Sequence, residues 1–171
     1  MKKIILLLLL LPISGFANNT IIESIREDRV GACERAYNEY QEHIQDKYIH
    51  LAQDPVVRCA TYMHLVFAYE SGFWTSNKCL EKNNCFGIRR PTYNFAKDDI
   101  QYRVWTGNFL IFDNWKDWNL AFARLYYRFH MNKNINQFVY AWSMTDRWTY
   151  KHFMRERFTD VYRIYEDIFR S

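Results

Sequence analysis

The sequence lacks the features that mark a membrane protein, a repeat protein or a nucleic-acid-binding protein. Its apolar run at residues 4–11 is too short to span a bilayer. It has no internal repeats, no low-complexity tract and no linker, so nothing divides it into flexibly joined parts. Its 23 Lys and Arg residues are nearly balanced by 19 Asp and Glu residues. Nothing in this evenly mixed charge indicates nucleic acid as a partner.

The sequence also lacks the ligand spacing of a zinc site. None of its five histidines lies close to another histidine or to a Cys-x-x-Cys pair. The four cysteines therefore favour disulfides over a metal centre. Three pairings of four cysteines are possible. We expect Cys79 with Cys85, which would staple the loop between them, and Cys33 with Cys59, which would tie two helices.

The first 17 residues have the pattern of an export signal. Lys2 and Lys3 precede the apolar run, Pro12 ends it, and Ala17 offers a small residue at the expected cleavage position. Removal of this segment would lower the formal charge from +4 to +2, because both lysines leave with it. It would leave 154 of the 171 residues, enough for one domain that buries about 70% of its unfolded surface. We expect a periplasmic or secreted protein without a membrane span, in an oxidising compartment where disulfides form.

Hydrophobic spacing predicts a mostly α, α+β protein. Residues 18–54 show a helical pattern with an expected break near residues 28–31, so that two helices form an N-terminal arm packed against the rest. Residues 55–69 predict a helix that Asp54 caps and Pro55 begins. Residues 100–112 predict a β-hairpin split at 106–108. Further helices are expected from 114 to 129, from 135 to 144 and from 148 to 169. Residues 55–171 then form one domain, a helical body with a small hairpin lobe.

Glu70 is the side chain best placed for acid chemistry. It falls in the last turn of the helix predicted at residues 55–69, near Phe67, Tyr69, Phe73 and Trp74. The negative end of the helix dipole and the apolar neighbours both disfavour a carboxylate, so we expect a raised pKa for Glu70. A carboxyl group that is protonated near neutral pH can protonate the leaving oxygen of a glycosidic bond.

The residues around Glu70 carry a resemblance to a known family. Glu70-Ser71-Gly72-Phe73-Trp74, followed after a short loop by Asn83-Asn84-Cys85-Phe86-Gly87-Ile88, resembles the signature of the bacterial endo-β-N-acetylglucosaminidase domain of autolysins and flagellar peptidoglycan hydrolases. This mannosyl-glycoprotein endo-β-N-acetylglucosaminidase-like family belongs to the lysozyme-like superfamily. Tyr140-Ala141, followed by Asp146 and Tyr150, resembles the family's Tyr-Ala-Thr-Asp-Pro-x-Tyr element, although residues 142–145 intervene where the family is shorter. The resemblance covers residues 56–168.

The resemblance implies a lysozyme-like fold and cleavage of the peptidoglycan glycan strand at N-acetylglucosamine, without a metal or an organic cofactor. Glu70 would be the general acid. A second carboxylate is left open among Asp98, Asp99 and Asp113, all on or around the hairpin. For Asp113 we favour the role of an N-cap over a catalytic one. The substrate's own 2-acetamido group could replace that carboxylate. Oligomeric state is not indicated.

The aromatic residues, 19% of the chain, suit either a core or a sugar-binding groove. Trp74, Phe86, Trp105 and Tyr140 are the expected groove residues, because each lies in or beside the motif or the hairpin. Four other rings at helical spacing are expected in the core: Phe122, Phe129, Phe153 and Phe158. Asn84 and Phe86 equally suit a turn that folds the loop.

Two other functions fit the same sequence. A lytic transglycosylase would act on the muramic acid side of the strand, but those enzymes typically carry a Gly-Leu-Met-Gln element where this chain has Cys85-Phe86-Gly87-Ile88. A non-catalytic peptidoglycan-binding or assembly protein would keep the cleft without hydrolysis. The absence of an obvious second carboxylate and the altered region after Tyr140 favour that alternative.

Overall fold

A computed structural model describes residues 16–44, 53–70, 84–89, 100–104, 109–143 and 146–171. Its helices are α2 (Phe16–Ile44), α3 (Pro55–Glu70), α5 (Trp115–Leu125), the π-helix η3 (Tyr126–His130), α6 (Ile135–Trp142) and α7 (Arg147–Arg170). The strands β1 (Tyr102–Val104) and β2 (Leu110–Phe112) form a two-stranded antiparallel sheet. The fold is therefore mostly α with a small β-hairpin, as the sequence predicted. The described residues contain no helix long and apolar enough to cross a membrane.

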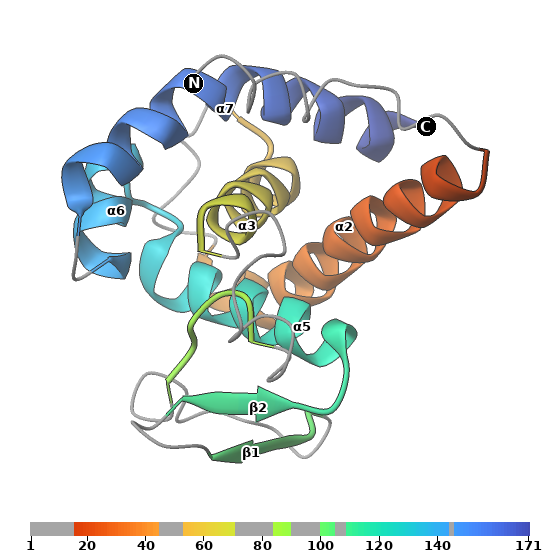
Figure 1. Ribbon diagram of the computed structural model, residues 1–171, viewed down its shortest axis with the longest axis horizontal. Helices are drawn as coiled ribbons and strands as arrows, with labels where there is room; N and C mark the ends of the chain where they lie inside the picture. The colour runs from red at the N-terminus through yellow and green to blue at the C-terminus, as the bar shows by residue number, and fades with distance from the viewer. Residues whose placement is uncertain (1–15, 45–52, 71–83, 90–99, 105–108, 144–145) are drawn as a thin grey trace.

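Helix α3 is the centre of the fold, with α2, α5 and α7 all packed against it (Figure 1). Asp54 caps its first turn, since the carboxylate Oδ1 accepts hydrogen bonds from the backbone N–H groups of Val56 at 2.8 Å and Val57 at 3.0 Å. The predicted cap and start are thus confirmed. Twelve of its sixteen residues are buried, so α3 is a core helix rather than a surface helix with one apolar face.

Over its described residues up to Ile44, the N-terminal arm is a single helix, α2, and the break expected near residues 28–31 is wrong. Gly31 lies within the helix, where one glycine costs only about 1 kcal/mol. Tertiary contacts on both sides outweigh that cost. Arg29 donates to the Tyr165 hydroxyl of α7 at 3.2 Å and lies over the Phe67 ring of α3. Two residues beyond Gly31, Cys33 is bonded to α3.

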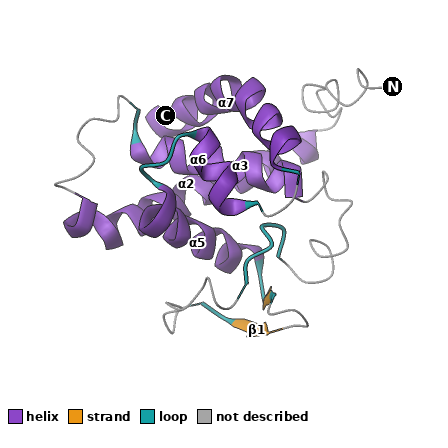
Figure 2. Ribbon diagram, turned by 90° about the vertical axis from the view of Figure 1, so that its left-hand side faces the viewer, coloured by secondary structure: helices purple, strands orange, loops and turns teal. Residues whose placement is uncertain are grey.

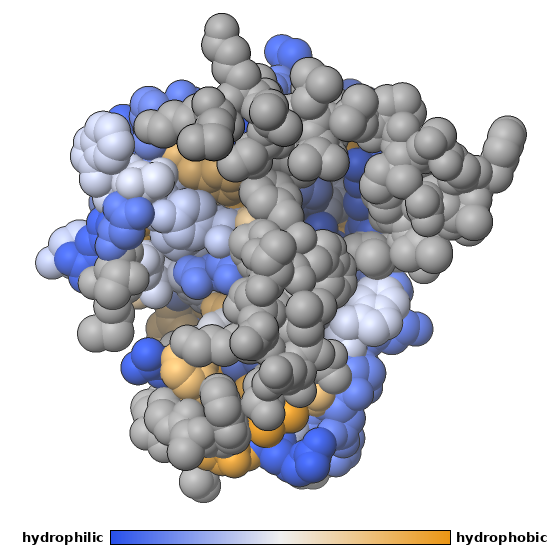
Figure 3. Space-filling model, viewed as in Figure 1, coloured by the Kyte–Doolittle hydropathy of each residue, from blue (hydrophilic) through white to orange (hydrophobic). Residues whose placement is uncertain are grey.

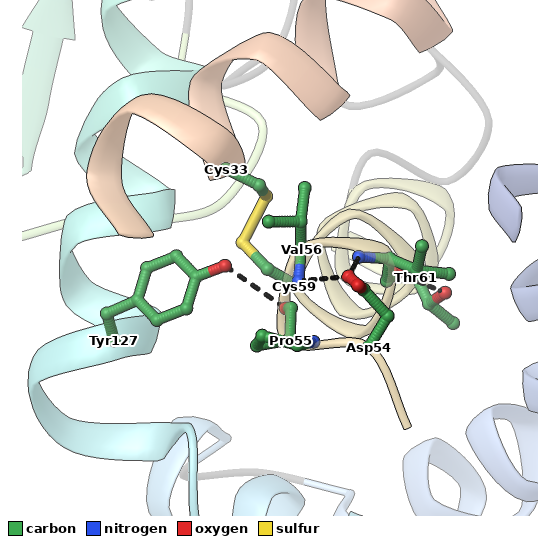
Figure 4. Close-up of a disulfide and its surroundings, with 8 residues drawn as sticks. Cys33, Asp54, Pro55, Val56, Cys59, Thr61 and Tyr127 are labelled. Carbon is green, nitrogen blue, oxygen red and sulfur yellow. Dashed lines mark hydrogen bonds between the residues drawn. A yellow bond between two sulfur atoms is a disulfide. The ribbon is translucent and has the colours of Figure 1, made fainter. Parts of the chain in front are cut away.

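The Cys33–Cys59 disulfide joins α2 to α3 and confirms that predicted pairing (Figure 4). Both cysteines are fully buried. The Tyr127 hydroxyl donates to the Pro55 carbonyl at 3.1 Å close by, which ties η3 to the same end of α3. Cys85 is also disulfide-bonded, whereas Cys79 lies outside the described residues.

Helix α5 begins one residue later than an Asp113 cap would require. Asn114 is the N-cap, because its side chain accepts from the Asp117 backbone N–H at 3.0 Å. The favoured capping role of Asp113 is therefore wrong. Beyond Leu125 the chain continues as η3, whose wider turn shifts the register of its side chains. Phe129 consequently faces outward, 43% exposed, so its expected place in the core is also wrong.

Phe122 is fully buried, and Phe153 and Phe158 pack against the core from α7, as expected. The hairpin lies at the end of the molecule away from α7, below α5 (Figures 1 and 2). Tyr102 pairs with Phe112 and Val104 with Leu110. Hydrophobic residues reach the surface at this end (Figure 3), where Val104 is 44% exposed.

Candidate functional site

Glu70 is the last residue of α3, as predicted, and is half-buried. Tyr69, the preceding residue, stacks on Tyr150 of α7, and the charge of Glu70 contributes to raising the pKa of both phenols. Tyr150 is fully buried, and its hydroxyl has no hydrogen-bond partner in the described part of the chain. The Glu70 carboxyl group thus lies at the end of α3, in the same region as a buried phenol whose hydroxyl has no hydrogen-bond partner among the described residues.

The rings of Tyr69 and Tyr150 hold α7 against the end of α3. They stack face to face, with centroids 3.9 Å apart and planes inclined by 4°. The Tyr69 hydroxyl donates to Asp146 Oδ2 at 3.3 Å. Asp146 is the N-cap of α7 and has a left-handed backbone (φ 40°, ψ 45°), a conformation uncommon for a residue other than glycine. Tertiary packing therefore places Asp146 and Tyr150 at the end of α3.

The phenols of this site are strongly protonated. Burial first, and then Asp146 and Glu70, raise the pKa of Tyr69 to about 12. Burial, Glu70 and Tyr69 raise the pKa of Tyr150 well above its usual value. Near neutral pH both groups are therefore hydrogen-bond donors, not bases.

The turn at Asn84 attaches the motif loop to the hairpin. The Asn84 side-chain N–H₂ donates to the carbonyls of Ile88 at 2.9 Å and Leu110 at 2.7 Å, while its Oδ1 accepts from the Ile88 backbone N–H at 2.9 Å. Gly87 has a φ of +65°, a conformation that favours glycine. Asn84 therefore has the loop-folding role that the sequence left open.

Phe86 lies in the core and is only 1% exposed. Its ring packs against Trp118 at 5.4 Å and Phe122 at 4.7 Å. It also meets Phe67 of α3 edge to face at 6.4 Å. The expected groove position of Phe86 is therefore corrected: its ring links the motif loop to α3 and α5, because burial among other rings outweighs any surface role.

Tyr140 is 68% exposed, and the Arg147 guanidinium covers one face of its ring at 4.1 Å. Of the groove residues predicted from the sequence it is the one that the structure describes at the surface. Trp74 and Trp105 lie outside the described residues. So do Asp98 and Asp99, two of the three carboxylates considered as a second catalytic group.

Asp113, the third of those carboxylates, is exposed and forms a 3.7 Å ion pair with Arg103 across the hairpin. Asp146 is a different carboxylate that sequence reasoning did not consider for this role, although it is linked to Glu70 through Tyr69. The resemblance to the Tyr-Ala-Thr-Asp-Pro-x-Tyr element was the signal in the sequence that could have identified Asp146.

Within the described residues no cluster of three potential metal ligands occurs. Comparisons with family models, curated proteins and solved structures found no match for this chain.

Proposed function

We propose that the chain is a periplasmic or secreted peptidoglycan hydrolase that cleaves the glycan strand at N-acetylglucosamine, with Glu70 as the general acid. One observation carries the proposal. Asp146 and Tyr150, which the family resemblance groups with Glu70 across more than 70 residues of sequence, lie against the turn of α3 that ends at Glu70. If the motifs resembled the family only by chance, there would be no reason for these residues to lie close together in the fold.

The chemistry at this turn suits glycosidic cleavage. Glu70 as a protonated carboxyl group would donate its proton to the leaving oxygen of the glycosidic bond. The buried Tyr150 hydroxyl is a hydrogen-bond donor without an acceptor among the described residues. It would position the Glu70 carboxylate left after proton transfer, because a phenol donates a strong hydrogen bond to an ionised acceptor.

Two groups could stabilise the positive charge that develops at the anomeric carbon. The 2-acetamido oxygen of N-acetylglucosamine can attack that carbon, which needs only one protein acid. Alternatively Asp146 supplies the second carboxylate from the N-terminus of α7. Asp113 is less suited, since its carboxylate is paired with Arg103.

Zymography on purified peptidoglycan tests the proposal. The native protein should clear the gel, and Glu70→Gln should lower the rate at least 100-fold, the size of a lost general acid. Glu166→Gln, at the other end of α7 in an ion pair with Arg170, is the matched control and should remain active. Clearing that survives in Glu70→Gln, or no clearing by the native protein, contradicts the proposal.

Mass spectrometry of the released fragments identifies the bond. Reducing N-acetylglucosamine ends are expected. Anhydro-muramic ends would instead assign a lytic transglycosylase, and binding to peptidoglycan without any fragment would assign a non-catalytic wall-binding protein.

A further inference from the structure

A cavity lies at the opposite end of α3 from Glu70. Its volume is about 440 Å³, and it opens between the start of α3, the start of α6 and the middle of α7. Its walls combine two arginines, three side-chain amides, two aromatic rings and one aliphatic side chain: Arg58, Arg155, Gln53, Asn134, Asn136, Tyr62, Phe158 and Ile135. Arg58 and Glu70 are twelve residues apart on α3, about 18 Å along the helix axis. The cavity is thus separate from the Glu70 site.

Arg58 is a buried cation with no anionic partner among the described residues. It is only 8% exposed, and its guanidinium donates to the Lys133 carbonyl at 2.7 Å and to Gln53 Oε1 at 3.3 Å. Its Nε has no hydrogen-bond partner within the described ranges, and no ion pair joins Arg58 to a carboxylate there. The neighbouring phenols cannot supply negative charge, because burial raises the pKa values of Tyr62 and Tyr126. A buried arginine is usually paired, since an uncompensated charge is costly to bury.

The other walls of the cavity indicate what would pair with Arg58. Arg155 adds a second, exposed guanidinium with no ion pair in the described part of the chain. Two guanidinium groups beside one cavity suit a carboxylate, which takes two charge-assisted hydrogen bonds from an arginine. The side-chain N–H₂ groups of Gln53, Asn134 and Asn136 can donate to the C=O of a peptide bond. The Asn136 oxygen can accept from the peptide N–H, whereas Gln53 Oε1 and Asn134 Oδ1 already accept from Arg58 and from the Gln137 backbone N–H.

We propose that this cavity binds the C-terminal carboxylate of a short peptide, with Arg58 and Arg155 holding the carboxylate and the rim amides holding the adjoining peptide group. The rings of Tyr62 and Phe158 would contact a small side chain of that peptide. A volume of about 440 Å³ is in the range of sites for small ligands. The proposal does not depend on the proposed hydrolase activity, since peptide binding should persist in Glu70→Gln.

An NMR titration that follows the arginine Nε–H signals tests this site. The probes are N-acetyl-dialanine as the free acid, the same dipeptide as its C-terminal amide, and inorganic phosphate. The free acid should shift the Arg58 signal with a Kd on the order of 1 mM, and the amide should bind at least ~10-fold more weakly, because it lacks the charge.

Arg155→Gln is the informative variant, because Arg58 also supports the fold through Lys133. It should weaken binding of the free acid about 10-fold while the protein remains folded. Arg163→Gln is the control, an exposed arginine on the same helix about 12 Å further along, and should bind as the native protein does. Equal binding of acid and amide, equal effects of the two variants, or no saturation up to about 20 mM overturns the site. Phosphate that binds as tightly as the free acid overturns its assignment to peptides.

Discussion

Replacing Glu39 by glutamine should destabilise the protein by about 3 kcal/mol. Glu39 of α2 receives two hydrogen bonds from Arg124 of α5, from Nε to Oε2 and from Nη2 to Oε1, each 2.7 Å long. The Arg124 side chain is fully buried and that of Glu39 is 18% exposed. Glutamine keeps one acceptor but removes the charge of Glu39, so the buried Arg124 cation loses the carboxylate that accepts hydrogen bonds from its Nε and Nη2 in the native protein. The cost of breaking such a pair is about 3 to 5 kcal/mol, and the remaining acceptor favours the lower end.

Urea denaturation followed by far-UV circular dichroism measures this loss. For a chain of this length, about 3 kcal/mol corresponds to a melting temperature roughly 6 to 12 °C lower. Arg35→Gln is the matched control, because Arg35 Nε lies 3.5 Å from the same Glu39 carboxylate but its side chain is 54% exposed. Its removal should cost under about 1 kcal/mol.

A second-site change separates loss of charge pairing from loss of packing. Arg124→Met combined with Glu39→Gln removes the buried cation, so the double variant should be more stable than Glu39→Gln alone. A cost of less than about 1 kcal/mol for Glu39→Gln, which is the value of a surface pair, or a cost equal to that of Arg35→Gln, would show that the buried charge pair does not stabilise the fold.

Two further predictions concern the same helical body. Removing the buried Cys33–Cys59 disulfide as the double serine variant should cost about 3 kcal/mol, since the bond spans 26 residues of sequence, and calorimetry should show a melting temperature lowered by roughly 10 °C. Burial, and then Lys133, lower the pKa of His130 to about 4, while unfolded histidine titrates near 6.5. The unfolded chain therefore binds the proton first, and the free energy of unfolding should fall by about 3 kcal/mol as pH drops from 6.5 to 4. His130→Gln should flatten that dependence in urea titrations at several pH values; an unchanged slope contradicts it.

Much of the local structure could be predicted because its causes are local. The Asp54 carboxylate caps a helix that Pro55 begins, and both signals lie within four residues of the bonds that they make. The hairpin follows from two short β-rich runs around a turn. The place of Glu70 in the last turn of α3 follows from the same helical period. None of these inferences needed to know what packs against the element.

The wrong predictions concern residues whose state depends on distant partners. Gly31 suggested a break in the N-terminal helix, but the contacts of Arg29 with α3 and α7 and the Cys33 bond keep α2 continuous. Phe129 fits the α-helical stripe of residues 114–129, yet the π-helix η3 turns it outward. Phe86 was expected in a groove and is enclosed by three rings from α3 and α5.

The sequence by itself predicted most of the helices, the hairpin and the position of Glu70 at a helix end, because spacing and caps act over one or two turns. It only favoured Cys33 with Cys59 among three possible pairings. Only the tertiary structure brought Asp146 and Tyr150 to Glu70, and only it buried the Arg58 guanidinium, which has no ion pair in the described part of the chain, beside a cavity. Both arrangements depend on how α7 crosses α3. The free energy that sets this crossing comes from the summed burial of side chains far apart in sequence, which no local pattern records.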